Sequence, residues 1–466
     1  MFRSGWSQGL AIVSALILTV AIHRYFTGFG EFGDEGSFCT IGDGILDGGL
    51  PYRDFFNEKP PLQYLWTAAV MAVGEQGLAG ARLAAEIALF LTLAIAFVGV
   101  ARNRLIETLL PVAAIWALLI VMASAYRNTA DESLALIFVA CVQLLFGQDP
   151  PATQRIRALA IGLLLGIACG FRVTAGLMLV VLFASPWLSG LRRPLVLGAG
   201  VGLALWVSWL GLAGILPEAI DATLFFHVGS AQAHAYQNSL GQVDWLPIIP
   251  AWTLLLTMAC AHFSFWKERA WFTALALAAS VTFFARPDAF RLWPAMAMMM
   301  TVAVSCAGPA LRSRLIYACL AALAVPLAWE RPVTGSYAWV HGIVESVRRY
   351  AGPDEPIWVA PFAPNVYCLS SNPPASRYYF VLPWTAKPQV QQQIMEDLQA
   401  KPPRIVVEVK RGFTLAQVMP RAMRWLERSY VLVEAQGGAN IWKLRDLPLP
   451  VASVGLIRVQ NRHLSE

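Results

Sequence analysis

The chain has 466 residues, of which 57% are hydrophobic and only 14% are charged, and its mean hydropathy is +0.55. Soluble proteins carry about 25% charged residues, so this composition excludes a water-soluble globule, a disordered chain and a nucleic-acid-binding protein. The cysteines lie mostly in apolar segments and show neither a disulfide framework nor a metal-ligand pattern. We therefore predict a polytopic α-helical membrane protein, and the net charge of +6 alone predicts no partner.

Apolar runs divide the chain into two predicted domains. A spanning helix needs about 20 mostly apolar residues, and residues 330–466 contain no run of that length. We therefore predict a membrane domain over 1–329 and a separate domain over 330–466. About eleven spanning helices are predicted in the first, near residues 8–26, 80–100, 106–124, 132–147, 158–171, 174–190, 195–213, 246–264, 270–285, 291–307 and 315–329.

Basic residues predict the orientation of these helices. Every second break between apolar runs carries a basic pair: Arg102/Arg104, Arg155/Arg157, Arg192/Arg193, Lys267/Arg269 and Arg312/Arg314. Cytoplasmic loops are enriched in Lys and Arg, so we predict a cytoplasmic N-terminus and an extracytoplasmic C-terminal domain. Residues 27–79 then lie wholly outside. The short apolar segment 60–75 must lie along or dip into the outer surface, because a span there would break the alternation.

The outer loop 27–79 holds the richest set of charged side chains. Asp34 precedes residues 37–46, which we predict as a short amphipathic helix, so Asp34 is either a helix cap or a functional carboxylate. Lys59 is the only outer-side lysine of the predicted membrane domain. It lies beside Glu58 and before two prolines that fix the local backbone. Its alternative role is snorkelling at the membrane interface.

A second outer loop brings an acid pair to the start of an apolar run. Asp131 and Glu132 follow Arg127 and Thr129. Capping of the predicted helix by Thr129 or Asp131 explains this pair economically. Binding of a metal or a substrate hydroxyl is the alternative.

Three arginines lie at predicted outer boundaries of apolar runs: Arg172, Arg286 and Arg291. They could pair with lipid headgroups or local acids. They could equally clamp a phosphate, because the guanidinium fork matches phosphate oxygens.

His227 and His234 could ligate a metal, but no tight ligand set accompanies them, and a surface histidine pair is the simpler interpretation.

Acidic and basic side chains from distant segments are thus predicted on one outer face of the protein, next to the hydrocarbon core of the membrane. That arrangement suits a substrate with an anionic head and a lipid tail, such as a lipid-phosphate sugar. A phosphate leaving group, with a second pKa near 6, needs no general acid, but it needs cations to stabilise its growing charge. The acceptor hydroxyl needs one carboxylate base.

Three motifs of the first outer loop resemble a known family. They are Gly33-Asp34-Glu35, Leu50-Pro51-Tyr52-Arg53-Asp54, and Glu58-Lys59-Pro60-Pro61-Leu62 with Tyr64. At this spacing after the first apolar run they resemble the first outer loop of GT-C fold glycosyltransferases. The chain is similar to lipid A aminoarabinose transferases, to rhizobial lipopolysaccharide galacturonosyltransferases and, more distantly, to protein O-mannosyltransferases. The resemblance continues at Asp131-Glu132-Ser133-Leu134 and at Arg172, where many members carry a lysine.

The resemblance implies a GT-C-like membrane domain in a bacterial inner (plasma) membrane. It implies inverting transfer from a polyprenyl-phosphate sugar donor to a hydroxyl of a glycan, lipid or protein acceptor outside the cytoplasm. Asp34 would be the base, and Glu58 and Lys59 would organise the site and hold the donor phosphate. Glu35 and Asp131 would help place substrate or, in some members, a metal. We predict no required metal or cofactor.

The remaining candidate substrate-binding residues are all arginines that we expect at the outer face. They are Arg53, Arg127, Arg172, Arg286 and Arg291.

Residues 330–466 are predicted to form a small extracytoplasmic α/β domain. Strands are expected at 356–360 and 404–409, helices at 389–400 and 415–429, and a closing strand pair at 430–433 and 440–444. This order favours a Rossmann-like layer arrangement. No G-x-G-x-x-G fingerprint is present, so nucleotide binding is not expected.

Two features of this domain leave alternatives open. The loop 373–379 could face the acceptor, although we favour an ordinary solvated turn. Cys39 and Cys368 are both expected outside, where a disulfide is allowed, but we do not predict one.

Two other functional classes fit the composition. A transporter or lipid flippase would place charges near the bilayer midplane and often has inverted repeats, whereas the charges here cluster at one boundary and no repeat is visible. A receptor or scaffold would leave the acid-rich first loop unexplained.

Overall fold

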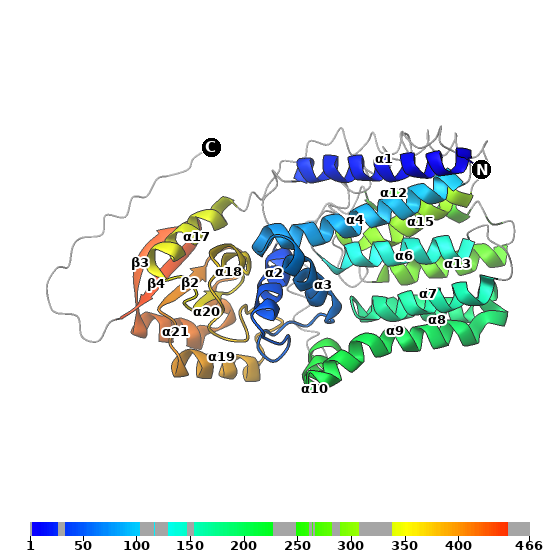
Figure 1. Cartoon of the computed structure of the whole chain (residues 1–466). Coiled ribbons are helices and arrows are strands. Elements are labelled where there is room, and N and C mark those ends of the chain that lie inside the picture. The colour runs from blue at the N-terminus through cyan, green and yellow to red at the C-terminus, as the bar shows by residue number, and fades with distance from the viewer. Residues whose placement is uncertain are drawn as a thin grey trace.

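The computed structural model describes residues 2–26, 33–102, 116, 129–146, 153–226, 248–260, 263, 266–281, 289–306 and 338–445. A bundle of long helices forms one side of the molecule, and a part that contains a β-sheet forms the other (Figure 1). Two short helices of residues 27–79, the predicted first outer loop, lie between them: α2 and α3. The predicted domain boundary at 329/330 falls outside the described residues and stays a prediction.

The bundle helices fall on the predicted apolar runs. They are α1 (Phe2–Phe26), α4 (Gly77–Arg102), α6 (Ala130–Phe146), α7 (Gln154–Cys169), α8 (Gly176–Ala184), α9 (Arg192–Leu212), α12 (Ile248–Cys260), α13 (Trp266–Ala279) and α15 (Trp293–Cys306). The predicted runs 106–124, apart from Trp116, and 315–329 lie outside the described residues. The total of about eleven spans therefore stays a prediction.

Several bundle helices have the composition of membrane spans. Within the described residues, Trp6–Arg24, Gly77–Gly99 and Pro186–Leu212 are long and apolar enough to cross a membrane. Their large apolar side chains point outward in places: Trp6 is 83% exposed, and Leu197 and Leu205 are also exposed. Exposed apolar faces of this extent suit contact with lipid.

Helices α7 and α9 pack with their backbones in close contact. A Cβ at Gly198 would lie 2.0 Å from the carbonyl oxygen of Leu159, and one at Gly202 would lie 2.3 Å from that of Leu163. Small residues four apart permit such close approach between membrane helices.

We expect Gly198→Ala to lower the melting temperature of the detergent-purified protein, because overpacking costs about 1–3 kcal/mol. Gly200→Ala is the matched control, since a Cβ at Gly200 meets nothing within 4 Å. The measurement is thermal unfolding followed by tryptophan fluorescence. Equal melting temperatures for the two variants would contradict the close packing.

Helices α2 (Gly33–Leu46) and α3 (Leu62–Val73) form the first outer loop. With 12 residues, α3 is about 18 Å long and is too short to cross a hydrocarbon core of about 30 Å. The prediction of an amphipathic helix over 37–46 was wrong in two respects. The helix already begins at Gly33, and it is buried on most sides, because α3, α4 and the C-terminal part all pack around it.

The C-terminal part contains a four-stranded sheet in the order β1-β2-β4-β3. The strands are β1 (Ile357–Ala360), β2 (Ile405–Val409), β3 (Tyr430–Gln436) and β4 (Ala439–Leu444). The helices are α17 (Ala338–Tyr350), α18 (Asn365–Ser370), α19 (Pro388–Ala400), α20 (Leu415–Val418) and α21 (Pro420–Ser429). The four strands and α19 lie where the sequence predicted them, and the helix predicted over 415–429 is divided into α20 and α21. Helices α17 and α18 were not predicted.

The Rossmann-like prediction holds for only half of this sheet. Strands β1 and β2 are parallel, but β4 pairs antiparallel with both β2 and β3. The reason is the tight turn at Gly437 and Gly438, which both have positive φ and return the chain directly beside β3. The sheet is therefore mixed.

Candidate functional site

The candidate site lies at the end of the bundle that faces the C-terminal part (Figure 1). Helix α3 is bonded there to both α6 and α7. The Leu62 amide donates to the Gly170 carbonyl at 2.8 Å, at the end of α7. The Ser133 hydroxyl of α6 donates to the Gln63 side chain at 3.3 Å. These bonds fix the first outer loop against the ends of α6 and α7.

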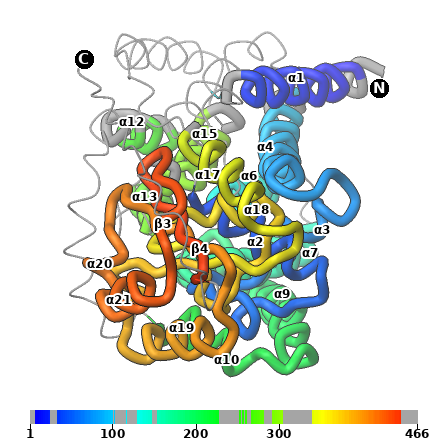
Figure 2. The backbone as a smooth tube through the Cα atoms, turned by 90° about the vertical axis from the view of Figure 1, so that its left-hand side faces the viewer, coloured from blue at the N-terminus to red at the C-terminus, as the bar shows by residue number. Residues whose placement is uncertain are grey.

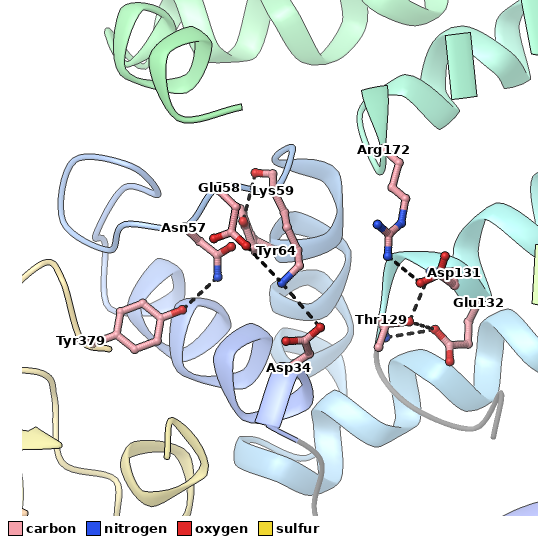
Figure 3. Close-up of polar contacts among 10 residues, drawn as sticks. All are labelled: Asp34, Asn57, Glu58, Lys59, Tyr64, Thr129, Asp131, Glu132, Arg172 and Tyr379. Carbon is pink, nitrogen blue, oxygen red and sulfur yellow. Dashed lines mark hydrogen bonds and ion pairs between the residues drawn. The ribbon is translucent and has the colours of Figure 1, made fainter. Parts of the chain in front are cut away.

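Asp34, Glu58 and Lys59 form one cluster, as the sequence predicted (Figure 3). The Lys59 Nζ lies 3.6 Å from Asp34 Oδ2 and 4.0 Å from Glu58 Oε1. The side chains are 18%, 24% and 18% exposed for Lys59, Asp34 and Glu58, so solvent or a ligand can reach them. Asp34 lies in the first turn of α2, where the helix dipole favours a carboxylate.

Two buried tyrosines fix the backbone of Lys59. Tyr52 and Tyr64 both donate their hydroxyl protons to the Lys59 carbonyl, at 2.8 and 3.0 Å. Tyr52 has a left-handed backbone with φ of 67°, a strained conformation for a residue with a bulky side chain. The Lys59 Nζ also lies 5.2 Å from the centre of the Phe38 ring. Sequence reasoning placed both tyrosines in the motifs but assigned them no role.

The C-terminal part contributes to this cluster directly. The Phe56 amide donates to the Arg377 carbonyl at 2.8 Å, and Asn57 Nδ2 donates to the Tyr379 hydroxyl at 3.1 Å. The prediction that loop 373–379 is a solvated turn was therefore wrong. Its residues Tyr378 and Tyr379 are buried, because the first outer loop packs on them.

Asp131 and Arg172 form a second charged pair near the cluster (Figure 3). The distance between Arg172 NH2 and Asp131 Oδ2 is 2.6 Å, and the side chains are 13% and 1% exposed. Asp131 Oδ1 and Arg172 Nε are buried and have no hydrogen-bond partner among the described residues. Atoms of this kind usually have a partner in a native structure, so a ligand or water is expected there.

Thr129 supplies the helix cap that the sequence proposed for either Thr129 or Asp131. The Thr129 hydroxyl accepts from the Asp131 amide at 3.3 Å, and Glu132 accepts from the Thr129 amide at 3.0 Å. These bonds cap the start of α6 and leave the Asp131 carboxylate available to Arg172.

Glu35 has a partner that sequence reasoning missed. Arg82 of α4 donates to both of its carboxylate oxygens, at 3.2 and 3.3 Å. Glu35 is buried, so this bidentate pair joins α2 to α4 at the base of the cluster. The signal available in the sequence was a lone arginine inside an apolar run.

The other predicted arginines are placed differently. Arg53 is exposed and pairs with its neighbour Asp54 at 3.1 Å, outside the cluster of Asp34, Glu58 and Lys59. Arg291 is half-buried in a short helix, η6 (Ala289–Leu292), before α15. Arg127 and Arg286, like the histidine pair, lie outside the described residues.

A disulfide that we did not predict joins α2 to the C-terminal part. Cys39 and Cys368 are bonded, with their Cα atoms 5.8 Å apart. Figures 1 and 2 show α18 beside α2, and a Cβ at Gly36 would lie 2.3 Å from Asn365 Oδ1. The two helices are therefore locked one turn beyond Asp34.

The disulfide also bears on metal binding. Within the described residues, the one grouping of three candidate metal ligands is Cys39, Asp43 and Cys368. Both sulfurs are in the disulfide, so no thiolate is available. The expectation that no ion is required stays a prediction.

Asp43 gives a pH-dependent prediction. Burial raises its pKa from 3.8 to about 6, and the charge of Asp47 adds to this, while a hydrogen bond from the Gly77 amide opposes it. Burial penalises the charged carboxylate in the folded protein only. The free energy of unfolding therefore falls as pH rises from about 4 to 6, where the unfolded protein loses this proton before the folded one does. Asp43→Asn should therefore raise stability at pH 8 by at most about 3 kcal/mol, with the gain disappearing near pH 4.

The measurement for Asp43→Asn is the melting temperature of both proteins between pH 4 and pH 8. A gain that does not change with pH would contradict the assignment to this carboxylate.

Comparison with solved structures gives the fold class. The chain is similar to ArnT from Cupriavidus metallidurans bound to undecaprenyl phosphate, with a TM-score of 0.60, 18% identity, and coverage of 94% of this chain and 98% of that one. Apo ArnT matches with a TM-score of 0.59, 18% identity, and coverage of 95% and 98%. The archaeal oligosaccharyltransferase AglB from Archaeoglobus fulgidus matches with a TM-score of 0.45 and 12% identity. This match covers 97% of this chain and 75% of that one.

No protein-family model and no curated protein sequence matches the chain. The match to ArnT covers nearly the whole of both chains, so the chain has the GT-C fold, as its first outer loop predicted.

Proposed function

We propose that this protein is an inverting glycosyltransferase that uses a polyprenyl-phosphate sugar donor on the outer face of a bacterial inner membrane. The cluster of Asp34, Glu58 and Lys59 carries this proposal, because it joins one accessible cation to two carboxylates at the end of a GT-C bundle. The ArnT structure with undecaprenyl phosphate supports a lipid-phosphate donor. The acceptor would be a hydroxyl of a glycan, lipid or protein.

Each residue of the cluster has a distinct proposed role. Asp34 removes the proton from the acceptor hydroxyl as its oxygen attacks the anomeric carbon. The bond from that carbon to the phosphate oxygen breaks, and its electron pair stays on the leaving polyprenyl phosphate. Lys59 stabilises this growing negative charge, and Glu58 orients Lys59. A single displacement of this kind inverts the configuration of the sugar.

The remaining polar groups would place the two substrates. The free atoms of Asp131 and Arg172 suit sugar hydroxyls or a phosphate oxygen. We propose that Arg53, Arg127, Arg286 and Arg291 contact the phosphate, the acceptor or lipid headgroups. Glu35, bound by Arg82, holds α2 in place rather than a substrate. We propose no required metal.

The test is a transfer assay with purified protein and a radiolabelled polyprenyl-phosphate sugar. We expect label in a covalently modified acceptor and an equal release of polyprenyl phosphate. The same protein is then placed in liposomes with labelled donor on one side. Movement of the donor across the bilayer without any covalent product would overturn the proposal in favour of a flippase.

A further inference from the structure

One phenol from the C-terminal part bonds to both elements that carry the cluster. The Tyr379 hydroxyl accepts from Asn57 Nδ2 at 3.1 Å, and it also shares a hydrogen bond with Ser37. Asn57 directly precedes Glu58, and Ser37 lies one helical turn after Asp34 on α2. Tyr379 therefore bridges the segment that presents Lys59 and the helix that presents Asp34. Figure 3 shows the bond to Asn57.

The backbone of Tyr379 is fixed from the other side. The Tyr367 hydroxyl donates to the Tyr379 carbonyl at 3.0 Å and accepts from the Val359 amide of β1 at 2.7 Å. The Val381 amide donates to the Pro361 carbonyl at 2.8 Å. Tyr367, Tyr379 and Val381 are buried. Hydrogen bonds thus join β1 to the backbone of Tyr379, and the Tyr379 side chain joins this backbone to Asn57, the residue before Glu58.

The phenol is neutral in this setting. Burial raises the pKa of Tyr379 above its ordinary value, and the charges of Glu58 and Asp34 act in the same direction, against the hydrogen bonds with Asn57 and Ser37. A neutral, fully buried hydroxyl supplies no charge to the reaction. Its contribution is to geometry.

We propose that Tyr379 is a positioning residue for the transfer reaction. Its hydroxyl holds α2 and the segment of Asn57 to Lys59 at the separation that keeps Asp34 opposite Lys59. This inference rests on the proposed function. A reacting group that moves by about 1 Å can lose about 100-fold in rate, so a hydroxyl that never touches substrate can control turnover.

The test is Tyr379→Phe, which removes one oxygen atom and keeps the ring. We expect kcat to fall about 10- to 100-fold, while KM for the donor changes by less than about threefold, because Lys59 keeps its charge. The matched control is Tyr430→Phe. Tyr430 is also buried in the C-terminal part, and its hydroxyl donates to the Pro403 carbonyl at 2.7 Å, away from the cluster.

The control separates positioning from stability. Tyr379→Phe loses the hydrogen bonds with Asn57 and Ser37, and Tyr430→Phe loses the one to Pro403, so we expect both melting temperatures to fall. Only Tyr379→Phe should lower kcat in the folded protein. An unchanged kcat in Tyr379→Phe would overturn the proposal.

A double variant tests the bridge itself. Asn57→Leu removes the partner of the same hydrogen bond, so adding it to Tyr379→Phe should lower kcat little further. Fully additive losses would show that the two residues act independently and would overturn the bridge.

Hydrogen–deuterium exchange makes the result independent of catalysis. In Tyr379→Phe we expect faster amide exchange in α2 (Gly33–Leu46), and in Tyr430→Phe no change there. Absence of transfer by the wild-type protein would refute the proposed function, yet the exchange result would still decide the role of Tyr379. Identical α2 exchange in both variants would overturn it.

Discussion

Asp34→Asn should abolish sugar transfer while leaving donor binding largely intact. An amide cannot accept the proton of the acceptor hydroxyl, and general bases contribute about 10²–10⁴-fold to rates. The variant keeps the size of the side chain and its place in the first turn of α2. We expect kcat to fall by that factor in the assay with labelled lipid-phosphate sugar, with the donor Kd changed by less than about threefold.

The control for this variant lies on the same helix. Asp43→Asn makes the same chemical change about two and a half turns away, beside the disulfide, and it should leave kcat unchanged. Full activity in Asp34→Asn would remove Asp34 as the base. Glu58 would then be the carboxylate to examine, because it lies on the other side of Lys59.

Lys59→Gln should weaken donor binding and slow the chemical step together. The ammonium is the one side-chain cation that the structure places between Asp34 and Glu58 among the described residues. A charge-assisted hydrogen bond is worth about 1.5–3 kcal/mol, so we expect the donor Kd to rise about 10- to 100-fold. The fall in kcat should be of similar size, since the growing phosphate charge loses its partner.

Lys410→Gln is the control for lysine removal, because Lys410 is exposed in the C-terminal part. Binding is measured with the labelled donor, and turnover with the transfer assay. A donor Kd equal to that of the wild-type protein would show that Lys59 does not hold the phosphate. Lys59→Arg should restore part of the binding, because it keeps the charge but changes its shape.

Much of the fold could be predicted because it depends on local patterns. Apolar runs predicted the bundle helices, since a helix in a membrane is apolar over its length. The β-branched run at Ile405–Val409 predicted a buried strand. The motifs of the first outer loop also predicted that Asp34, Glu58 and Lys59 gather in one place, since they are close in sequence.

What could not be predicted are contacts between distant segments. Arg172 and Asp131 are 41 residues apart, Arg82 and Glu35 are 47 apart, and Tyr379 and Asn57 are 322 apart. No local pattern specifies such partners. The same cause explains the errors on α2 and on loop 373–379. Helix α2 is buried by α3, α4 and α18, and the loop by the segment of Phe56 and Asn57, and a sequence pattern shows an element without its neighbours.

The disulfide and the Tyr379 bridge together set an order of events during biosynthesis. Cys39 and Cys368 are 329 residues apart, so the helix with Asp34 is synthesised long before its covalent partner. If both cysteines reach an oxidising compartment, as their bond requires, the disulfide of the first outer loop cannot form there until α18 arrives. A nascent chain interrupted before α18 would thus carry all three residues of the cluster without the framework that aligns them. The alignment of the cluster would therefore begin only after α18 and the loop with Tyr379 have been synthesised.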